Sequence, residues 1–184
     1  MHRTLLWLLA TAALAGSAGP PARTAMPAPP PAVGEAARTG GRPWPVPGTP
    51  VVVRTWNPPA TPYGPGHRGV DLAAPPGTEI RAVAAGRVTF AGPVAGTGVL
   101  TITLDGSGSP PLRTTYEPVR ALVRVGERVA AGQLVATVET EEAAPAHCKE
   151  EGCLHWGLKR GEVYLNPLAL VRGGHARLLP VWGV

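Results

Sequence analysis

Residues 99–108, Val-Leu-Thr-Ile-Thr-Leu-Asp-Gly-Ser-Gly, show the pattern that decides the fold class. From residue 100 onward, large apolar side chains alternate with threonine, which is the two-residue period of a β-strand with one buried face. The Asp-Gly-Ser-Gly that follows has the residue types of a hairpin turn, and residues 113–117 can supply the returning strand. This stretch therefore predicts an antiparallel β-hairpin.

The same features recur throughout residues 46–172, which we predict to be one domain with one core. Short runs rich in β-branched residues, separated by glycine and proline, predict further strands at residues 51–55, 79–83, 86–92, 134–139 and 154–159. Single helical turns are expected near residues 119–122 and 167–171. The prediction is an all-β fold, a compact antiparallel barrel or two-sheet sandwich.

The N-terminal residues have a different character. Residues 1–19 combine a short basic head, an apolar run and a small-residue exit, which predicts a secretory signal peptide. The apolar run, residues 5–15, is about half the roughly 20 residues of a membrane-spanning helix, so no stable span is expected after cleavage. A buried N-terminal helix is the alternative, but neither a polar face nor a cap accompanies the run. Export predicts a secreted, extracytoplasmic protein.

Two flanking segments are not expected to contribute to a core. Residues 20–45 are rich in proline, alanine and glycine, which predicts an extended, disordered linker. Residues 173–184 form a C-terminal tail in which no site is identified, although His175 and Trp182 lie there.

The net charge of the chain limits the classes of partner that it is expected to bind. The formal net charge is +5 and the isoelectric point is near 9.9, carried mostly by scattered arginines. Outside a cell, this charge suits attraction to an anionic wall polymer or membrane surface. Nucleic acid is not expected as a partner, because the basic residues form no cluster interleaved with aromatic residues.

Three residues form a candidate metal site. His67 and Asp71 lie four apart in Gly-His-Arg-Gly-Val-Asp-Leu, and His155 lies in Cys-Leu-His-Trp-Gly-Leu, within a predicted strand. Two imidazoles and one carboxylate are a sound zinc set that leaves a fourth, catalytic position open. Spacing alone does not exclude a surface His67 beside a turn-forming Asp71.

Five sequence blocks, in order, give the chain its resemblance to a known family. The blocks are His-Arg-Gly-Val-Asp-Leu-Ala-Ala-Pro-Pro-Gly-Thr (67–78), Ile-Arg-Ala-Val-Ala-Ala-Gly-Arg-Val (80–88), Val-Gly-Glu-Arg-Val-Ala-Ala-Gly-Gln (125–133), Leu-His-Trp-Gly-Leu (154–158) and Leu-Asn-Pro-Leu (165–168). Together they resemble the lysostaphin- or LytM-type zinc metallopeptidases, metallopeptidase family twenty-three. The resemblance implies an antiparallel barrel-sandwich like a duplicated hybrid motif, zinc on His67, Asp71 and His155, and peptidoglycan peptides as substrate at the cell wall.

Two positions depart from the pattern of active members of that family. Those members carry two further histidines that act as acid and base, and the resemblance places these at Pro118 and Cys153. Losing one positioned acid or base costs about 10²- to 10⁴-fold in rate. Glu117 and His147 are candidate substitutes, although on an alternating strand Glu117 would point to the face opposite residue 118. Whether the protein is an enzyme is left open at this stage.

Cys148 and Cys153 are the only cysteines. In an exported protein, such a pair is most simply a disulfide. The alternative is a structural zinc site that joins both thiolates to His147 or His155, since the spacing is close to that of zinc ligands. A disulfide would remove Cys153 as a base or ligand.

The residues and the resemblance together give two classes of function. The first is a zinc endopeptidase of low activity that trims peptidoglycan peptides. The second is a non-catalytic monomer that binds wall peptides or regulates a partner cell-wall hydrolase. A lipoyl or biotinyl carrier is a third interpretation of residues 125–134, but no turn offers the lysine that such a domain modifies.

Overall fold

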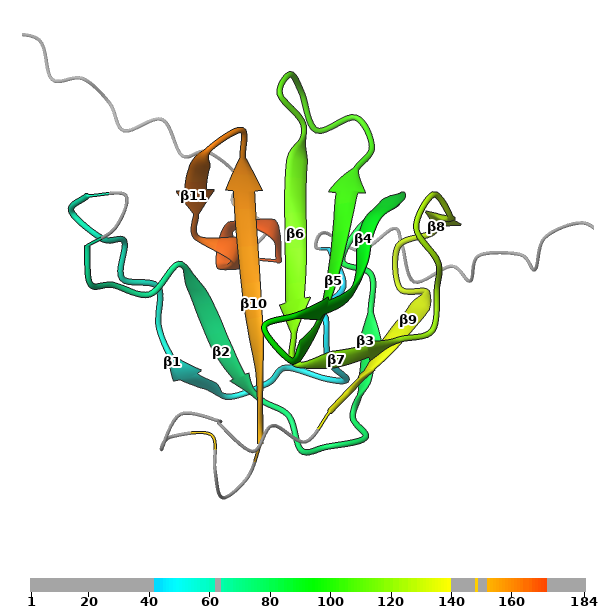
Figure 1. Ribbon diagram of the computed structural model, residues 1–184, viewed down its shortest axis with the longest axis horizontal. Helices are drawn as coiled ribbons and strands as arrows, with labels where there is room; N and C mark the ends of the chain where they lie inside the picture. Colours follow the sequence, from blue (N-terminus) through cyan, green and yellow to red (C-terminus); the bar gives the residue numbers. More distant parts are fainter. Residues whose placement is uncertain (1–41, 62–63, 140–147, 149–151, 172–184) are drawn as a thin grey trace, which may run out of the picture. The chain divides into compact units, whose positions relative to one another are not determined.

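The computed structural model describes residues 42–61, 64–139, 148 and 152–171. In these residues the regular structure consists almost entirely of β-strands (Figure 1). The strands are β1 (Val52–Arg54), β2 (Gly69–Ala73), β3 (Glu79–Arg81), β4 (Gly86–Val94), β5 (Thr97–Leu104), β6 (Leu112–Glu117), β7 (Val119–Ala121), β8 (Arg128–Val129), β9 (Leu134–Val138), β10 (Cys153–Arg160) and β11 (Val163–Leu165). A short 3-10 helix, η3 (Pro167–Leu170), follows them. The predicted all-β class is confirmed.

The strands form two antiparallel sheets. The large sheet has the order β1-β2-β10-β6-β5-β4-β8, with β11 paired to β10, and the small sheet has the order β3-β9-β7. The late strand β10 lies between β2 and β6, which are far apart in the sequence (Figure 1). This insertion brings residues from three distant segments side by side.

Two of the three turns expected from the sequence are present. The turn after β5 has left-handed glycines, with φ of 60° at Gly106 and 100° at Gly108, as its composition indicated. The helical turn expected near residues 119–122 is wrong, because Val119 and its neighbours form β7, paired with β9. Val119 is buried to 2% exposure, and a β-branched residue packs well on such a strand. The turn expected near residues 167–171 is present as η3, capped by the Asn166 side chain.

The core lies against one face of the large sheet. Leu154, Trp156 and Leu158 alternate along β10 and are 0%, 0% and 3% exposed. The Trp156 indole N–H donates a hydrogen bond to the Thr114 hydroxyl oxygen over 2.8 Å, and its ring lies 6.3 Å from that of Trp44. The side chain of Trp156 therefore packs into the core, on the face of β10 opposite His155.

The opposite side of this sheet carries different residues. Because side chains alternate along a strand, His155, Gly157 and Lys159 project away from Trp156. We call this second side the site face. The two faces of β10 thus separate the core from the candidate site.

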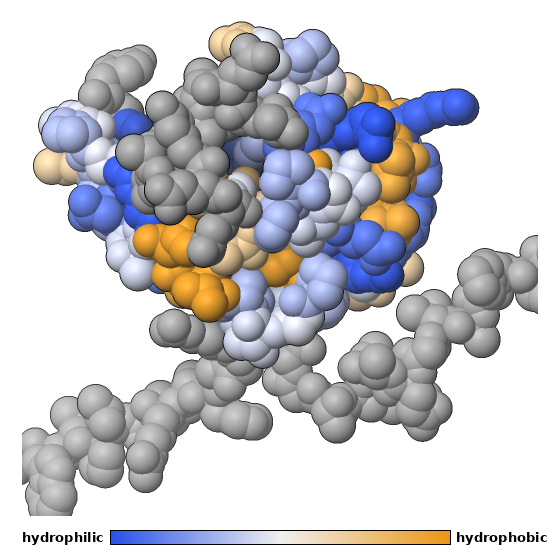
Figure 2. Space-filling view, turned by 90° about the horizontal axis from the view of Figure 1, so that it is seen from below, coloured by the Kyte–Doolittle hydropathy of each residue, from blue (hydrophilic) through white to orange (hydrophobic). Residues whose placement is uncertain are grey.

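Apolar residues also reach the surface of the described part of the chain. Figure 2 shows hydrophilic and hydrophobic residues interspersed on one side of it. The most exposed large apolar side chains are those of Val51, Val125 and Val163, at 68%, 61% and 62%. Scattered exposure of this kind is ordinary for a soluble fold. Among the described residues, no helix is long and apolar enough to cross a membrane.

Candidate metal centre

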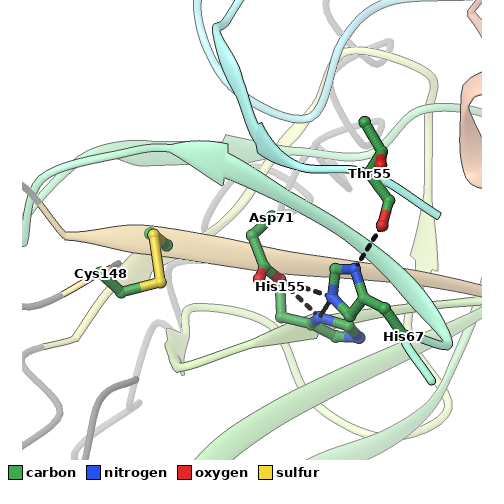
Figure 3. A network of polar contacts seen from close by, with 6 residues as sticks. Thr55, His67, Asp71, Cys148 and His155 are labelled. Carbon is green, nitrogen blue, oxygen red and sulfur yellow. Dashed lines mark hydrogen bonds and ion pairs between the residues drawn. A yellow bond between two sulfur atoms is a disulfide. The ribbon is translucent and has the colours of Figure 1, made fainter. Parts of the chain in front are cut away.

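Three elements position the predicted metal ligands. Asp71 lies in β2 and His155 in β10, and the register of the two strands makes them direct cross-strand neighbours. His67 lies in the loop before β2, where its backbone exchanges two hydrogen bonds with Asn57. The ring of His67 thereby turns toward the other two side chains (Figure 3).

The potential ligand atoms converge closely. Nε2 of His67 lies 3.0 Å from Oδ1 of Asp71 and 3.1 Å from Nδ1 of His155. Nδ1 of His155 lies 2.7 Å from the same carboxylate oxygen. His67 and Asp71 are buried, whereas the side chain of His155 is 26% exposed. Among the described residues, these three form the one cluster with suitably placed ligand atoms.

A backbone carbonyl fixes the tautomer of His67. The ring nitrogen Nδ1 lies 2.8 Å from the carbonyl oxygen of Thr55. A carbonyl oxygen can only accept a hydrogen bond, so Nδ1 carries the hydrogen and Nε2 of the neutral ring presents a lone pair to the cluster. Metal-binding histidines are oriented in the same way by the hydrogen bond of their second nitrogen.

A glycine makes room for the ring of His155. A Cβ atom added to Gly69 would lie 2.5 Å from the carbonyl oxygen of Trp156 and 2.7 Å from both Cε1 and Nε2 of His155. Gly69 is the cross-strand neighbour of Gly157, one position along from Trp156. The Gly-Val-Asp sequence therefore places a carboxylate while leaving space for the imidazole of the next strand.

The three donor atoms fit a tetrahedral metal ion. Ligand atoms at about 2.0–2.1 Å from a tetrahedral zinc lie about 3.3 Å from one another. The donor atoms of the cluster are 2.7–3.1 Å apart, so small movements would accommodate the ion. One carboxylate and two nitrogen lone pairs also form a donor set that a cation stabilises.

The strand register decides the position of Glu117. His155 pairs with Asp71 on one side and with Glu117 on the other, so all three lie in one row across β2, β10 and β6. Residues paired in this way project to the same side of a sheet. Glu117 therefore lies on the site face. From the sequence, Glu117 was expected to point to the face opposite residue 118. Pro118 lies between the end of β6 and the start of β7, so the alternation of side chains along β6 does not extend to it.

The cysteines form a disulfide, as predicted. Cys148 and Cys153 are bonded, with 5.1 Å between their Cα atoms, and no free cysteine remains (Figure 3). Cys153 begins β10 two residues before His155 and pairs with Ala73 of β2. The disulfide excludes the alternative zinc site on two thiolates. His147, the other candidate base, lies outside the described residues.

Tyr116 belongs to the core and not to the candidate site. Its side chain is fully buried, which raises its pKa to about 12 because the phenolate would lose its hydration. Hydrogen bonds with Thr114 and with the backbone of Val83 lower the pKa slightly in return. A role for this hydroxyl beside the metal ligands is therefore not supported.

Known proteins share both the sequence and the fold. An uncharacterised protein of Mycobacterium tuberculosis is 39% identical over 142 residues, covering 75% of this chain and 54% of that protein. The structure of Csd3 from Helicobacter pylori is 27% identical, with a TM-score of 0.51, and the match covers 67% of this chain and 34% of that one. The catalytic domain of the antimicrobial peptidase lysostaphin from Staphylococcus simulans is 20% identical and shares the fold, with a TM-score of 0.50 and coverage of 62% and 86%.

The chain spans about half the length of the curated relatives it matches. The fold is nevertheless of the lysostaphin type, which confirms the architecture that the resemblance implied. A family model, "Peptidase family M23", matches residues 65–167, more than half of the chain, and this range contains all three residues of the cluster. The chain therefore belongs to Peptidase family M23.

Proposed function

We propose that this protein acts at the bacterial cell wall, holds zinc on His67, Asp71 and His155, and binds peptidoglycan peptides that it cuts slowly or not at all. One observation supports this proposal most strongly. The three ligand-type side chains converge, while Pro118 and the disulfide-bonded Cys153 occupy the positions where the family resemblance expects acid and base histidines. The side chains that would bind the metal ion are present, whereas the side chains that would transfer protons are replaced.

The residues of the chain would divide the work as follows. His67, Asp71 and His155 would hold zinc, which acidifies water and polarises carbonyl groups when bound. The carbonyl of Thr55 keeps His67 in the tautomer that binds a metal. Neither Pro118 nor a half-cystine can move a proton. The loss of two such groups lowers the rate by about 10²- to 10⁴-fold for each.

A second candidate function is a working peptidase in which Glu117 is the base. The observation that favours it is the row formed by Asp71, His155 and Glu117, which places a second carboxyl group, on β6, beside the metal ligands. A third possibility is regulation of a partner cell-wall hydrolase by the same site. The predicted export would suit all three, and the disulfide is consistent with an oxidising compartment.

The test is metal content together with peptide release. The full chain, with and without His67→Ala, would be analysed for zinc and then incubated with purified peptidoglycan. We expect near-stoichiometric zinc in the wild type, loss of zinc in the variant, and little or no release of soluble peptide. Wild-type protein without zinc would contradict the metal assignment.

Glu117→Gln separates the first two functions, with Glu79→Gln as its control because Glu79 lies in the small sheet. If the wild type releases peptide and only Glu117→Gln abolishes the release, the protein is a peptidase with Glu117 as its base. Release that persists in Glu117→Gln would instead show that another group serves as the base.

A further inference from the structure

Two cations lie on the site face at a distance from the metal ligands. The register of β10 and β6 pairs Lys159 with Arg113, just as it pairs His155 with Glu117. Residues four apart on a strand project to the same side, and at about 3.3 Å per residue the two rows are about 13 Å apart. Lys159 and Arg113 therefore share the face of the metal ligands.

A low floor connects the two rows. Between them, Gly157 pairs with Gly69 on β2 and with Thr115 on β6. Among the described residues, a Cβ added to Gly157 would meet nothing closer than 3.8 Å, so no side chain crowds this position. The Thr115 hydroxyl lies 3.2 Å from that of Thr101, which continues the polar floor. Thr115 and Thr101 are partly exposed, so an extended peptide backbone could lie across this row, beside the His155 ring that covers Gly69.

The two cations already hold a carboxylate. The ammonium group of Lys159 donates a hydrogen bond to Glu162 over 2.7 Å and lies 5.1 Å from the centre of the Tyr164 ring. The guanidinium group of Arg113 donates to the carbonyl of Gly161 over 2.9 Å and lies 3.7 Å from Glu162. Both cations are thus positioned by neighbours while remaining partly exposed.

A carboxylate of a bound peptide could displace the Glu162 side chain from Lys159 and Arg113. It lies in the turn between β10 and β11, and its side chain is 88% exposed. The hydrogen bond from Lys159 lowers its pKa below the usual value, followed by the charges of Lys159 and Arg113. Exposed ion pairs contribute little to stability, so a better-placed carboxylate can replace this one.

We propose that Arg113 and Lys159 form a carboxylate-binding subsite for a peptide that extends from the metal ligands across the row of Gly157, Thr115 and Thr101. This inference rests on the proposed function and adds a substrate feature to it. Charge complementarity and the planar guanidinium group favour a carboxylate. The spacing of about 13 Å corresponds to about four extended residues between the metal ligands and that carboxylate.

The experiment compares two peptides that differ in one group. The full chain with zinc bound is titrated calorimetrically with a peptidoglycan stem tetrapeptide that ends in a free carboxylate or in a carboxamide. The wild type is expected to prefer the carboxylate form about tenfold, as for one charge-assisted hydrogen bond. Arg113→Gln/Lys159→Gln should abolish this preference while zinc content and affinity for the carboxamide form stay unchanged.

Two further variants sharpen the test. Arg120→Gln/Arg124→Gln removes the same charge from exposed positions in β7 and the segment after it, and should keep the preference. Glu162→Gln removes the internal competitor and should raise affinity for the carboxylate form alone. Weaker binding of that form by Glu162→Gln would contradict displacement.

Other outcomes would overturn the subsite in distinguishable ways. Equal affinity of the wild type for both peptides would contradict the subsite but leave peptide binding intact. Absence of binding by either peptide would contradict the proposed function as well. Tighter binding of inorganic phosphate than of the carboxylate peptide, lost in Arg113→Gln/Lys159→Gln, would reassign the cations to the phosphate of a wall polymer.

Discussion

The two faces of β10 differ although their residues alternate along one strand. On the core face, Leu154, Trp156 and Leu158 are almost completely buried. On the site face, His155 reaches solvent and Gly157 has no side chain. Burial of apolar area stabilises the fold in proportion to that area, so the free energy of folding comes mainly from the first face. Partly exposed side chains of the second face, such as that of Lys159, can therefore change with little loss of stability.

This division is consistent with a chain that keeps the family fold while Pro118 and Cys153 stand where the resemblance expects histidines. Pro118 lies just after β6, and Cys153 begins β10. Neither belongs to the fully buried set led by Trp156 and Tyr116. Pro118 is partly exposed, and Cys153 is 7% exposed and bonded to Cys148, so neither adds a large side chain to the packing around Trp156.

The largest expected effect comes from opening the core face. Trp156→Ala should lower the free energy of unfolding by about 3–5 kcal/mol, since it leaves a large cavity and removes the hydrogen bond that the indole donates to Thr114. Urea denaturation measures the change. Lys159→Ala, on the other face of the same strand, should cost less than about 1 kcal/mol. Similar costs for the two variants would contradict the division between the faces.

A smaller effect is confined to alkaline pH. The pKa of Tyr116 is raised to about 12 in the folded protein, whereas an unfolded tyrosine titrates near about 10. The unfolded chain loses this proton first, so the stabilisation is complete below about pH 10 and is lost as the pH rises toward about 12. This difference of two pKa units corresponds to about 3 kcal/mol in the free energy of unfolding.

Tyr116→Phe should remove this part of the alkaline loss of stability, measured as urea midpoints between those pH values. Tyr164→Phe is the matched control because Tyr164 is 41% exposed. A stability curve for Tyr116→Phe that falls as steeply as that of the wild type would show that other groups cause the loss.

A third substitution, with a smaller expected loss of stability than Trp156→Ala, tests whether Gly69 provides the space for the His155 ring. Gly69→Ala should cost about 1–3 kcal/mol, because the new methyl group would overlap the His155 ring and the Trp156 carbonyl oxygen. Zinc content should fall with it. Gly157→Ala is the control, since its methyl group would meet only ordinary contacts. Full zinc content in Gly69→Ala would show that the ring of His155 can move aside.

Much of the fold and the cluster could be predicted from the sequence. The alternation in residues 99–104 identified β5, and the strand predicted at residues 154–159 is present as part of β10. The cysteine pair indicated its disulfide through compartment and number. These features depend on neighbours in the sequence or on a resemblance in order, and both are visible in one chain.

Features set by pairing between distant strands were not predictable. Glu117 lies on the site face because β6 and β10 pair in one particular register, and no local pattern specifies that register. The row of Arg113 and Lys159 depends on the same pairing. Strands β8 and β11 contain only two and three residues, too few to show a period. Val119 was assigned to a helical turn because its strand, β7, is equally short.

The insertion of β10 between β2 and β6 also has a consequence for the order of folding. A chain synthesised from its N-terminus presents β2 and β6 long before β10 exists to join them. Because distant pairings close large loops, we expect the large sheet to form late and slowly. His67 and Asp71 are synthesised long before His155, so the candidate metal centre can form only when nearly the whole domain is available.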